Sequence, residues 1–337
     1  MLKQILLAAA VAVSVAASES CAAAASSPEP LRVETHVNGG LSFDTVSSLI
    51  IGAEAAVLID MPLAIPQARD LAAWVKNTTD KPLVGVFCSH FHPDHYLSGG
   101  ALLDQFPGTP FYASIEAIEH IQFEVSDVAK VWAGVFGQEN IVAAPTVPEP
   151  YNFSIITLPG NQDSPIHLIN PLVGDTIDET LFWIPSIKTL IAGDSIFASN
   201  FHCWLTDLLT PTLTKGWLST LDLIEDLAPE VIIPGHSVVN SGFGPSRDLE
   251  YTRKYVTFFQ TEIEAKGVDF FTVPEIVNKF DVAFPGLSQN NVSTTPAVIL
   301  NFTANEFGRG GNRFKHHVDL KSFQNATGLS GYELGQM

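Results

Sequence analysis

The segment Phe87–His95, with the sequence FCSHFHPDH, constrains the fold of this chain more than any other stretch. An apolar run comes directly before its histidines, which predicts a buried strand that ends here. Side chains two positions apart on an extended segment project from one face, so His90 and His92 should point together. Pro93 cannot continue a central strand, and the chain must therefore turn there.

Asp94 and His95 follow that turn and complete a set of four potential metal ligands. Neutral imidazole and carboxylate groups bind zinc and iron in proteins, and this set has room for two adjacent metals. A histidine-rich surface loop is the alternative interpretation, and an isolated histidine pair would favour it. Four such side chains at the end of a strand favour a metal site.

Two later apolar runs also end on a residue of this chemical type. The run 189–192 leads to Asp194, and the run 231–233 leads to His236. A metal site at strand ends of an α/β fold needs ligands from distant parts of the chain. We therefore expect both side chains beside the histidine segment.

Strand-like runs and amphipathic helices alternate along the chain, which indicates a layered α/β fold. The predicted strands lie at 31–37, 46–51, 55–60, 83–87, 110–113, 155–158, 166–169, 181–184, 189–192 and 231–233. The predicted helices lie at 66–76, 98–106, 114–137, 217–227 and 246–266, with a less regular region after them. No repeat or low-complexity linker divides the chain, so we predict one domain, 26–337, with a C-terminal extension from about residue 245.

The composition argues against several classes of partner. Apolar residues make up 46% of the chain and charged residues 16%, as in a packed globular protein. Acidic residues outnumber basic ones by 36 to 17, and the net charge of −19 repels nucleic acid and anionic lipid headgroups. We expect a small-molecule substrate, and the sequence leaves the oligomeric state open.

The N-terminus has the pattern of a secretory signal peptide. Lys3 precedes an apolar run that is too short to span a bilayer, so stable membrane insertion is not expected. We predict a signal peptide over residues 1–25, with cleavage between Ala17 and Ser27, and a secreted mature protein. Five triplets of the N-glycosylation type favour the same route, with acceptors at Asn77, Asn152, Asn291, Asn301 and Asn325.

Only Cys88 and Cys203 remain after such processing, so no disulfide framework holds the fold together. Both cysteines flank the predicted site. A single bridge between them and a pair of buried free thiols are both compatible with the sequence.

With these segments in place, the chain resembles the metallo-β-lactamase superfamily of metallohydrolases. The likeness rests on HFHPDH at His90–His95, LIAGDSIF at Leu190–Phe197 and IIPGHS at Ile232–Ser237, in the family's order. It extends from about Leu31 to His236. The resemblance implies an α/β fold of the αββα sandwich type, in which helices flank two mixed β-sheets and the metals lie at one edge.

The same resemblance implies a site for two zinc ions, with manganese or iron as alternatives. The implied ligands are His90 and His92 for the first metal and Asp94, His95 and His236 for the second. Asp194 would bridge both, since a shared carboxylate can hold two cations close together. Asp94 is also the predicted catalytic residue, because it is suited to orient the attacking water or take up a proton.

The chain departs from the family pattern at one ligand. The segment Gly174–Pro185, GDTIDETLFWIP, looks like the family segment that usually reads GHTPGHT. Asp175 then stands where a third histidine of the first site belongs, and Glu179 replaces the next histidine. We predict Asp175 as the ligand, which hardens the site and weakens its preference for zinc. The alternatives are an ordinary turn residue at Asp175 and another alignment that brings in Asn161 or His167.

Softer expectations concern aromatic and histidine side chains outside these motifs. His202 and Trp204 follow Asp194, where a loop could overhang the metals, so either a substrate role or a packing role is open. The apolar positions of helix 114–137 are expected in the core, with lining of a substrate pocket as the alternative. Surface positions are expected for the histidines without ligand-like neighbours, which are His36, His120, His316 and His317.

The predicted function is a secreted metal-dependent hydrolase of an ester, lactone, thioester or lactam, acting through metal-bound hydroxide. A small neutral or mildly apolar substrate suits the aromatic-rich helix. One alternative is a mononuclear iron oxygenase of the same fold, which uses two histidines and a carboxylate. The other is a non-catalytic secreted binding protein that kept the fold.

Overall fold

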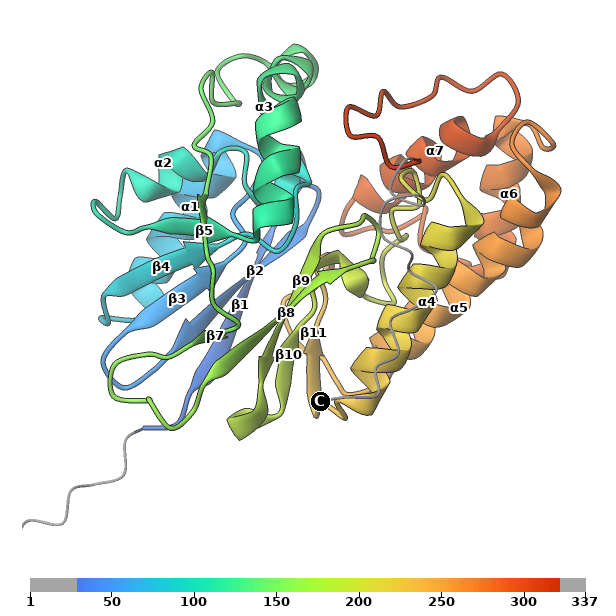
Figure 1. Ribbon diagram of the computed structural model, residues 1–337. Coiled ribbons are helices and arrows are strands. Elements are labelled where there is room, and N and C mark those ends of the chain that lie inside the picture. The colour runs from blue at the N-terminus through green and yellow to red at the C-terminus, as the bar shows by residue number, and fades with distance from the viewer. Residues whose placement is uncertain (1–28, 322–337) are drawn as a thin grey trace, which may run out of the picture.

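The structure, a computed structural model, describes residues 29–321 of the chain. The predicted signal peptide and the acceptor Asn325 lie outside the described residues, and the limits 26–337 of the domain stay a prediction. Two β-sheets face each other, and helices cover their outer faces (Figure 1). This arrangement is the αββα sandwich of two mixed sheets that the sequence predicts.

The first sheet contains six strands whose spatial order is also their order along the chain. The strands are β1 (Arg32–Asn38), β2 (Thr45–Ile51), β3 (Ala56–Ile59), β4 (Leu83–Phe87), β5 (Phe111–Ala113) and β6 (Glu149–Pro150). The first three pair antiparallel, and β3 to β6 pair parallel. Every residue of β2 and β3 is buried, as expected for strands covered on both faces.

The second sheet contains five strands in the order β11-β10-β9-β8-β7. The strands are β7 (Ile155–Ile156), β8 (Ile166–Leu172), β9 (Glu179–Ile184), β10 (Thr189–Ile191) and β11 (Val231–Ile233). All neighbours pair antiparallel except β10 and β11, which are parallel. The two parallel strands therefore end at the same edge.

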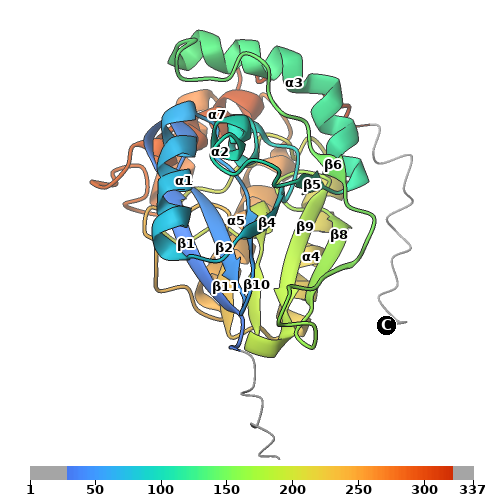
Figure 2. The ribbon, with the colours of Figure 1, turned by 90° about the vertical axis from the view of Figure 1, so that its left-hand side faces the viewer.

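Helices lie outside both sheets, and α3 crosses the top of the molecule (Figure 2). Those beside the first sheet are α1 (Ile65–Thr78), α2 (Gly99–Leu103) and α3 (Ile115–Phe136). Those beside the second are α4 (Pro211–Asp226), α5 (Arg247–Glu262), α6 (Val273–Ala283) and α7 (Thr295–Phe307). Among the described residues, no helix is long and apolar enough to cross a membrane.

The region after residue 266 is more regular than the sequence analysis expects, because it contains α6 and α7. The local signals are present in the sequence. Thr272 and Glu275 form a capping box at the start of α6, and a proline occupies its first turn. Pro296 occupies the same place in α7. The region that the sequence analysis expects to be less regular therefore contains two well-formed helices.

An apolar layer between the sheets holds them face to face. Ile50 and Phe87 of the first sheet belong to the same buried cluster as Phe182 and Ile184 of the second. The rings of Phe87 and Phe182 are 6.0 Å apart. Because burial of one such side chain contributes roughly 2 kcal/mol, this layer fixes the position of the strand ends that carry the site.

Both cysteines of the described chain are buried free thiols. The Cys88 thiol donates to the carbonyl of His90, with a distance of 2.8 Å between sulfur and oxygen. Burial raises the pKa of both thiols well above the ordinary value. Of the two alternatives, the structure therefore has the free thiols and not the bridge.

Candidate metal centre

The candidate site lies where strands of both sheets end. β4 ends at Phe87, directly before the histidine segment. β10 and β11 end just before Asp194 and His236, as expected from their apolar runs. Asp175 comes from the loop between β8 and β9. Residues that are far apart in the sequence thus meet at one edge of the sandwich.

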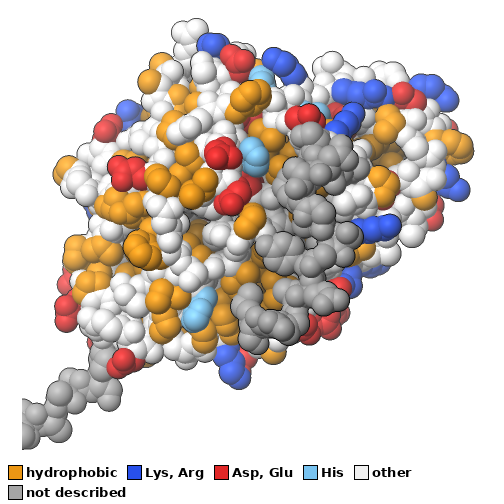
Figure 3. All heavy atoms as spheres, in the orientation of Figure 1, with side chains coloured by type: hydrophobic (Ala, Val, Ile, Leu, Met, Phe, Trp, Pro, Cys, Tyr) orange, Lys and Arg blue, Asp and Glu red, His pale blue; other side chains and the backbone are white. Residues whose placement is uncertain are grey.

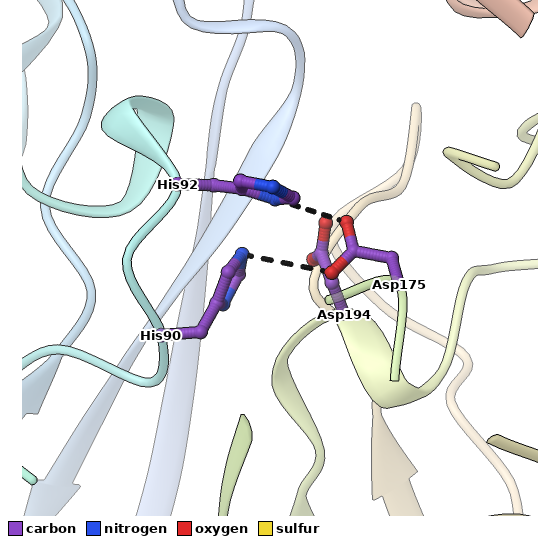
Figure 4. A group of neighbouring side chains, drawn as sticks. All are labelled: His90, His92, Asp175 and Asp194. Carbon is purple, nitrogen blue, oxygen red and sulfur yellow. Dashed lines mark ion pairs between the residues drawn. The ribbon is translucent and has the colours of Figure 1, made fainter. Parts of the chain in front are cut away.

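The structure brings all seven predicted ligand residues together in two neighbouring groups. Within each group, every residue has a nitrogen or oxygen atom within 4.8 Å of such an atom on each of the others. The first group is His90, His92, Asp175 and Asp194, and the second is Asp94, His95 and His236. In the first group, the two histidines project from one side and the two aspartates from the other (Figure 4). The predicted residues are therefore correctly placed, and their role as ligands stays a prediction.

Asp175 faces both histidines of the first group (Figure 4). Its Oδ2 is 3.1 Å from Nδ1 of His92, and its Oδ1 is 3.9 Å from Nε2 of His90. Burial raises the pKa of Asp175 to about 7. Glu179 is also buried in this region, with Oε1 3.4 Å from Nδ1 of His90.

The other two interpretations of this part of the sequence do not match the geometry. A turn residue would point to solvent, whereas the side chain of Asp175 is fully buried. Asn161 holds a different turn, since it accepts from the Ala53 amide at 2.7 Å and donates to the Glu29 carbonyl at 2.7 Å. His167 lies on β8 and is paired with Trp183.

Asp194 belongs to the first group and also contacts two histidines of the second. Its Oδ2 is 3.1 Å from Nε2 of His236, and its Oδ1 is 3.4 Å from Nε2 of His95. Burial alone would raise the pKa of Asp194, but the adjacent His236 and His95 hold it well below its ordinary value. A carboxylate in this position fits the predicted role of a bridge between two cations.

Each histidine of the two groups uses its other ring nitrogen in a hydrogen bond of 2.8 to 3.0 Å. The partners are Oγ of Ser89 for His90, Asp207 for His92, Asp60 for His95 and the Phe43 carbonyl for His236. Contacts of this kind fix the ring orientation of metal-binding histidines. They leave one nitrogen of each ring facing the centre of the site.

The atoms that face the centre fit a metal. Buried side-chain atoms without a hydrogen-bond partner in the described part of the chain include Nε2 of His90, Nε2 of His95, both oxygens of Asp175 and Oδ1 of Asp194. Buried polar atoms nearly always have a partner, so this convergence is unusual. Imidazole and carboxylate donors suit a divalent cation. The residues present therefore fit one or two metal ions.

A cavity opens beside the two groups, with Asp94, Asp175 and Asp194 in its floor. Its wall is largely apolar and comes from α3, α7 and the segment after α7, which folds back over the site. Figure 3 shows apolar surface on this face of the molecule, with acidic and histidine side chains gathered in its upper middle. Val128 and Trp132 of α3 line the cavity, so the pocket alternative holds for part of this helix.

The two candidate substrate-contacting residues, His202 and Trp204, occupy different environments. Trp204 lines the cavity, and its ring lies 6.0 Å from that of His92. His202 does not line it, because its ring is buried between Tyr255 and Ser288, with Nδ1 2.8 Å from the tyrosine hydroxyl and Nε2 3.1 Å from Oγ of the serine. Of the two roles left open for His202, this placement fits packing.

Five residues at the site were missed. Asp60 ends an apolar strand just as Asp194 does, so a sequence signal existed for it. Asp207 and Glu124 carry no local signal. The surface position expected for His316 was wrong, because its Nδ1 is 2.7 Å from Oδ1 of Asp207 and its ring lines the cavity. His317 lines the cavity as well.

Comparison with known proteins agrees with this geometry. The model of the metallo-beta-lactamase superfamily matches residues 42–236, which is more than half of the chain. The chain belongs to this superfamily. It is 23% identical over 211 residues to a probable metallo-hydrolase of Streptococcus pyogenes serotype M6, covering 62% of this chain and 83% of that protein. It is 22% identical over 222 residues to the metallo-beta-lactamase IND-1 of Chryseobacterium indologenes, covering 65% and 82%.

Solved structures share the fold. An inverting sec-alkylsulfatase from a Pseudomonas species matches with a TM-score of 0.50 and 19% identity. The match covers 80% of this chain and 49% of the sulfatase, so this chain spans about half of that protein. A metallo-beta-lactamase from Pontibacter korlensis matches with a TM-score of 0.46 and 18% identity, covering 67% of this chain and 94% of the other. At these identities the likeness concerns the fold alone.

Proposed function

We propose that the protein is a secreted hydrolase that uses two divalent metal ions, zinc first among them, to cleave an ester, lactone, thioester or lactam. The observation that carries the proposal is the position of Asp194. Asp194 is a member of the first group of potential ligands, and its two oxygens also lie 3.1 and 3.4 Å from His236 and His95 of the second group. Membership of a superfamily whose members are in general metal-dependent hydrolases supports the same conclusion.

When bound, two such ions supply an activated water and polarise the substrate carbonyl. The chain holds them with imidazole and carboxylate groups whose orientation the surrounding hydrogen bonds fix. Asp94 lies at the floor of the cavity, with its side chain 15% exposed. Its Oδ2 accepts from Oγ1 of Thr45 at 3.4 Å and lies 3.3 Å from Nε2 of His236. A carboxylate held there can orient the water or take up its proton.

Secretion and N-glycosylation are part of the proposal. The four acceptor asparagines that the structure describes are all exposed, which glycosylation requires; they are Asn77, Asn152, Asn291 and Asn301.

The test is elemental analysis of the purified protein together with a panel of chromogenic lactone, thioester and β-lactam substrates. We expect close to two metal ions per chain and hydrolysis that a chelator abolishes and added zinc restores. His92→Ala should lose both metal and activity, whereas the matched control His167→Ala should keep both. Hydrolysis that survives complete removal of metal would contradict the proposal.

The first group by itself suggests a second candidate. Two histidines and one carboxylate, here His90, His92 and Asp175, form the ligand set of mononuclear iron oxygenases. One iron per chain and oxygen uptake during turnover would favour this candidate over the hydrolase. Metal binding without turnover of any substrate would favour a non-catalytic binding protein.

A further inference from the structure

An acidic side chain interrupts the apolar face of α3. The buried positions of this helix follow helical spacing, and all but one are apolar or small; they are Ala117, Ile118, Ile121, Glu124, Val128, Ala129 and Trp132. Glu124 is only 5% exposed, and it lines the cavity beside the metal centre. A carboxyl group is costly to bury at such a position unless it has a partner.

Glu124 has no such partner in the described part of the chain. Its carboxyl makes no hydrogen bond and no ion pair with any residue between 29 and 321. Burial raises the pKa of Glu124 to about 8, so the group is an uncharged carboxylic acid at neutral pH. Such a group can both donate and accept a hydrogen bond. A buried polar side chain that faces a cavity without a partner indicates a ligand that enters the cavity.

Away from the proposed metal ions in its floor, the wall of the cavity offers no free cation for an anionic group. No lysine or arginine lines it among the described residues. The hydrogen bond to Asp207 and the ion pair with Glu306 outweigh burial and raise the pKa of His316 to about 9, so this cation is already neutralised by two carboxylates. Burial lowers the pKa of His317, the other imidazole in the wall. A substrate with a negatively charged group would therefore lose its hydration in this cavity and gain no opposite charge in return.

We propose that Glu124 determines substrate specificity, and that the cavity takes an uncharged ester, thioester or lactone with a largely apolar acyl chain. The Glu124 carboxyl binds a polar group of that substrate by a hydrogen bond, while the apolar wall covers its hydrocarbon part. The cleavage of the substrate in this inference rests on the proposed hydrolase function, whereas the preference for uncharged substrates rests on the cavity alone. Carboxylate-bearing, phosphorylated and sulfated tails are disfavoured by the same wall.

The first test compares two esters that differ only at the end of the acyl chain. The metal-loaded protein should cleave 4-nitrophenyl hexanoate with a kcat/KM about 100-fold above that for the mono-4-nitrophenyl ester of adipate. Glu124→Lys should reduce this ratio at least tenfold, because it places a cation in the wall. Glu119→Lys makes the same charge change on the exposed side of α3 and should leave the ratio unchanged.

A second test needs no turnover. Heptan-2-one and 6-oxoheptanoate differ in the same way, cannot be hydrolysed, and can be titrated through the fluorescence of Trp132 and Trp204, which line the cavity. Heptan-2-one should bind more tightly than 6-oxoheptanoate. Glu124→Leu removes the carboxyl and adds no charge to the apolar face of α3. The variant should bind 7-hydroxyheptan-2-one, whose hydroxyl would bond to that carboxyl, about tenfold more weakly, while its affinity for heptan-2-one changes little. Glu124→Gln keeps a neutral donor and should retain the affinity.

The outcomes separate this inference from the proposed function. Selective ketone binding that depends on Glu124, in a protein that hydrolyses nothing, would sustain the inference and refute the hydrolase. Chelator-sensitive hydrolysis with no preference for the uncharged ester would refute the inference and leave the hydrolase intact. Failure of all three ketones to bind would also overturn the inference, as would a Glu124→Leu variant with unchanged affinity for them.

Discussion

Asp60 and His95 are joined by a hydrogen bond of 3.0 Å between the aspartate Oδ2 and the imidazole Nδ1. Both side chains are buried, and the Asp60 carboxylate also accepts from the amide of Ser89 at 2.7 Å and from its hydroxyl at 2.9 Å. One carboxylate at the end of β3 thus holds both ends of the histidine segment. The backbone of Asp60 has a φ of 64°, a conformation that aspartate and asparagine tolerate better than most residues.

Asp60→Asn should therefore keep the fold and weaken metal binding. Asparagine preserves the shape and the backbone conformation but removes the charge that orients His95. Losses of 10- to 100-fold in metal affinity are typical for such partners of metal-binding histidines. Competition with a chromogenic chelator measures the affinity, and Asp163→Asn on the exposed surface is the control. Wild-type affinity in Asp60→Asn would show that this hydrogen bond does not support the site.

Asp175→Ala should lower the metal content by about one ion per chain without unfolding the protein. The carboxylate is fully buried, so its removal relieves a desolvation cost that offsets the loss of its 3.1 Å contact with His92. Elemental analysis and thermal melting measure the two effects. Asn161→Ala is the control variant. It removes the side chain that bonds to Ala53 and Glu29, so it should lower the melting temperature and leave the metal content unchanged. Full occupancy in Asp175→Ala would move the missing ligand elsewhere.

Asp207 is a positioning residue with three donors. It accepts from Nε2 of His92 at 2.9 Å, from Nε1 of Trp204 at 2.6 Å and from Nδ1 of His316 at 2.7 Å. We expect Asp207→Asn to reduce kcat/KM by about 10- to 100-fold, because His92 loses its charged partner. His316→Gln removes only the imidazole that the C-terminal segment contributes to Asp207, so it should reduce kcat/KM by less. Equal losses in the two variants would mean that the segment, and not His92, transmits the effect.

His202 should make the stability of the protein depend on pH. Burial lowers the pKa of His202 from 6.5 to about 3 in the folded protein. Between those values the unfolded chain binds a proton that the folded chain does not, so the stability present above pH 6.5 is lost as the pH falls towards 3. The slope contributed by this group approaches about 1.4 kcal/mol per pH unit.

Urea unfolding of His202→Gln at pH 6.5, 5.5 and 4.5 measures that contribution, and most of this slope should be absent from the variant. Tyr255→Phe removes the hydroxyl next to the ring but keeps the ring buried. It should therefore retain the slope, since burial is the cause of the shift. A slope that disappears in Tyr255→Phe would assign the effect to the hydrogen bond.

Secretion from a eukaryotic host should yield a glycosylated protein. Treatment with peptide-N-glycosidase should reduce its mass, and successive Asn→Gln substitutions at 77, 152, 291, 301 and 325 should remove the difference stepwise. The same chain made in a bacterial cytoplasm is the control. A protein that reaches the medium with an unmodified mass would contradict the glycosylation prediction.

The parts of the site that the sequence predicts are those with a local signal. Asp194 and His236 follow short apolar strands, and such a run predicts both the strand and the exit of the chain at its edge. Asp60 has the same signal and was missed, since no resemblance drew attention to it. Asp175 required the comparison with the family segment, because a Gly-Asp-Thr turn alone is common.

The remaining features depend on packing between distant elements. Glu124 is one polar residue in an amphipathic helix, and only the fold shows that its face of α3 covers the metal centre. His316 reaches Asp207 because α7 directs the following segment back across the cavity. The buried position of His202 depends on Tyr255 of α5, a contact that no pattern near either residue indicates.

Each ligand group draws on both sheets, and this has a practical consequence. His90 and His92 belong to the part of the chain that builds the first sheet, whereas Asp175 and Asp194 belong to the part that builds the second. A cut in the connection 151–154 would give two fragments, neither of which holds a complete set of ligands. Metal would then act as a chemical dimeriser, and the chain could serve as a split reporter whose reassembly follows the free metal concentration.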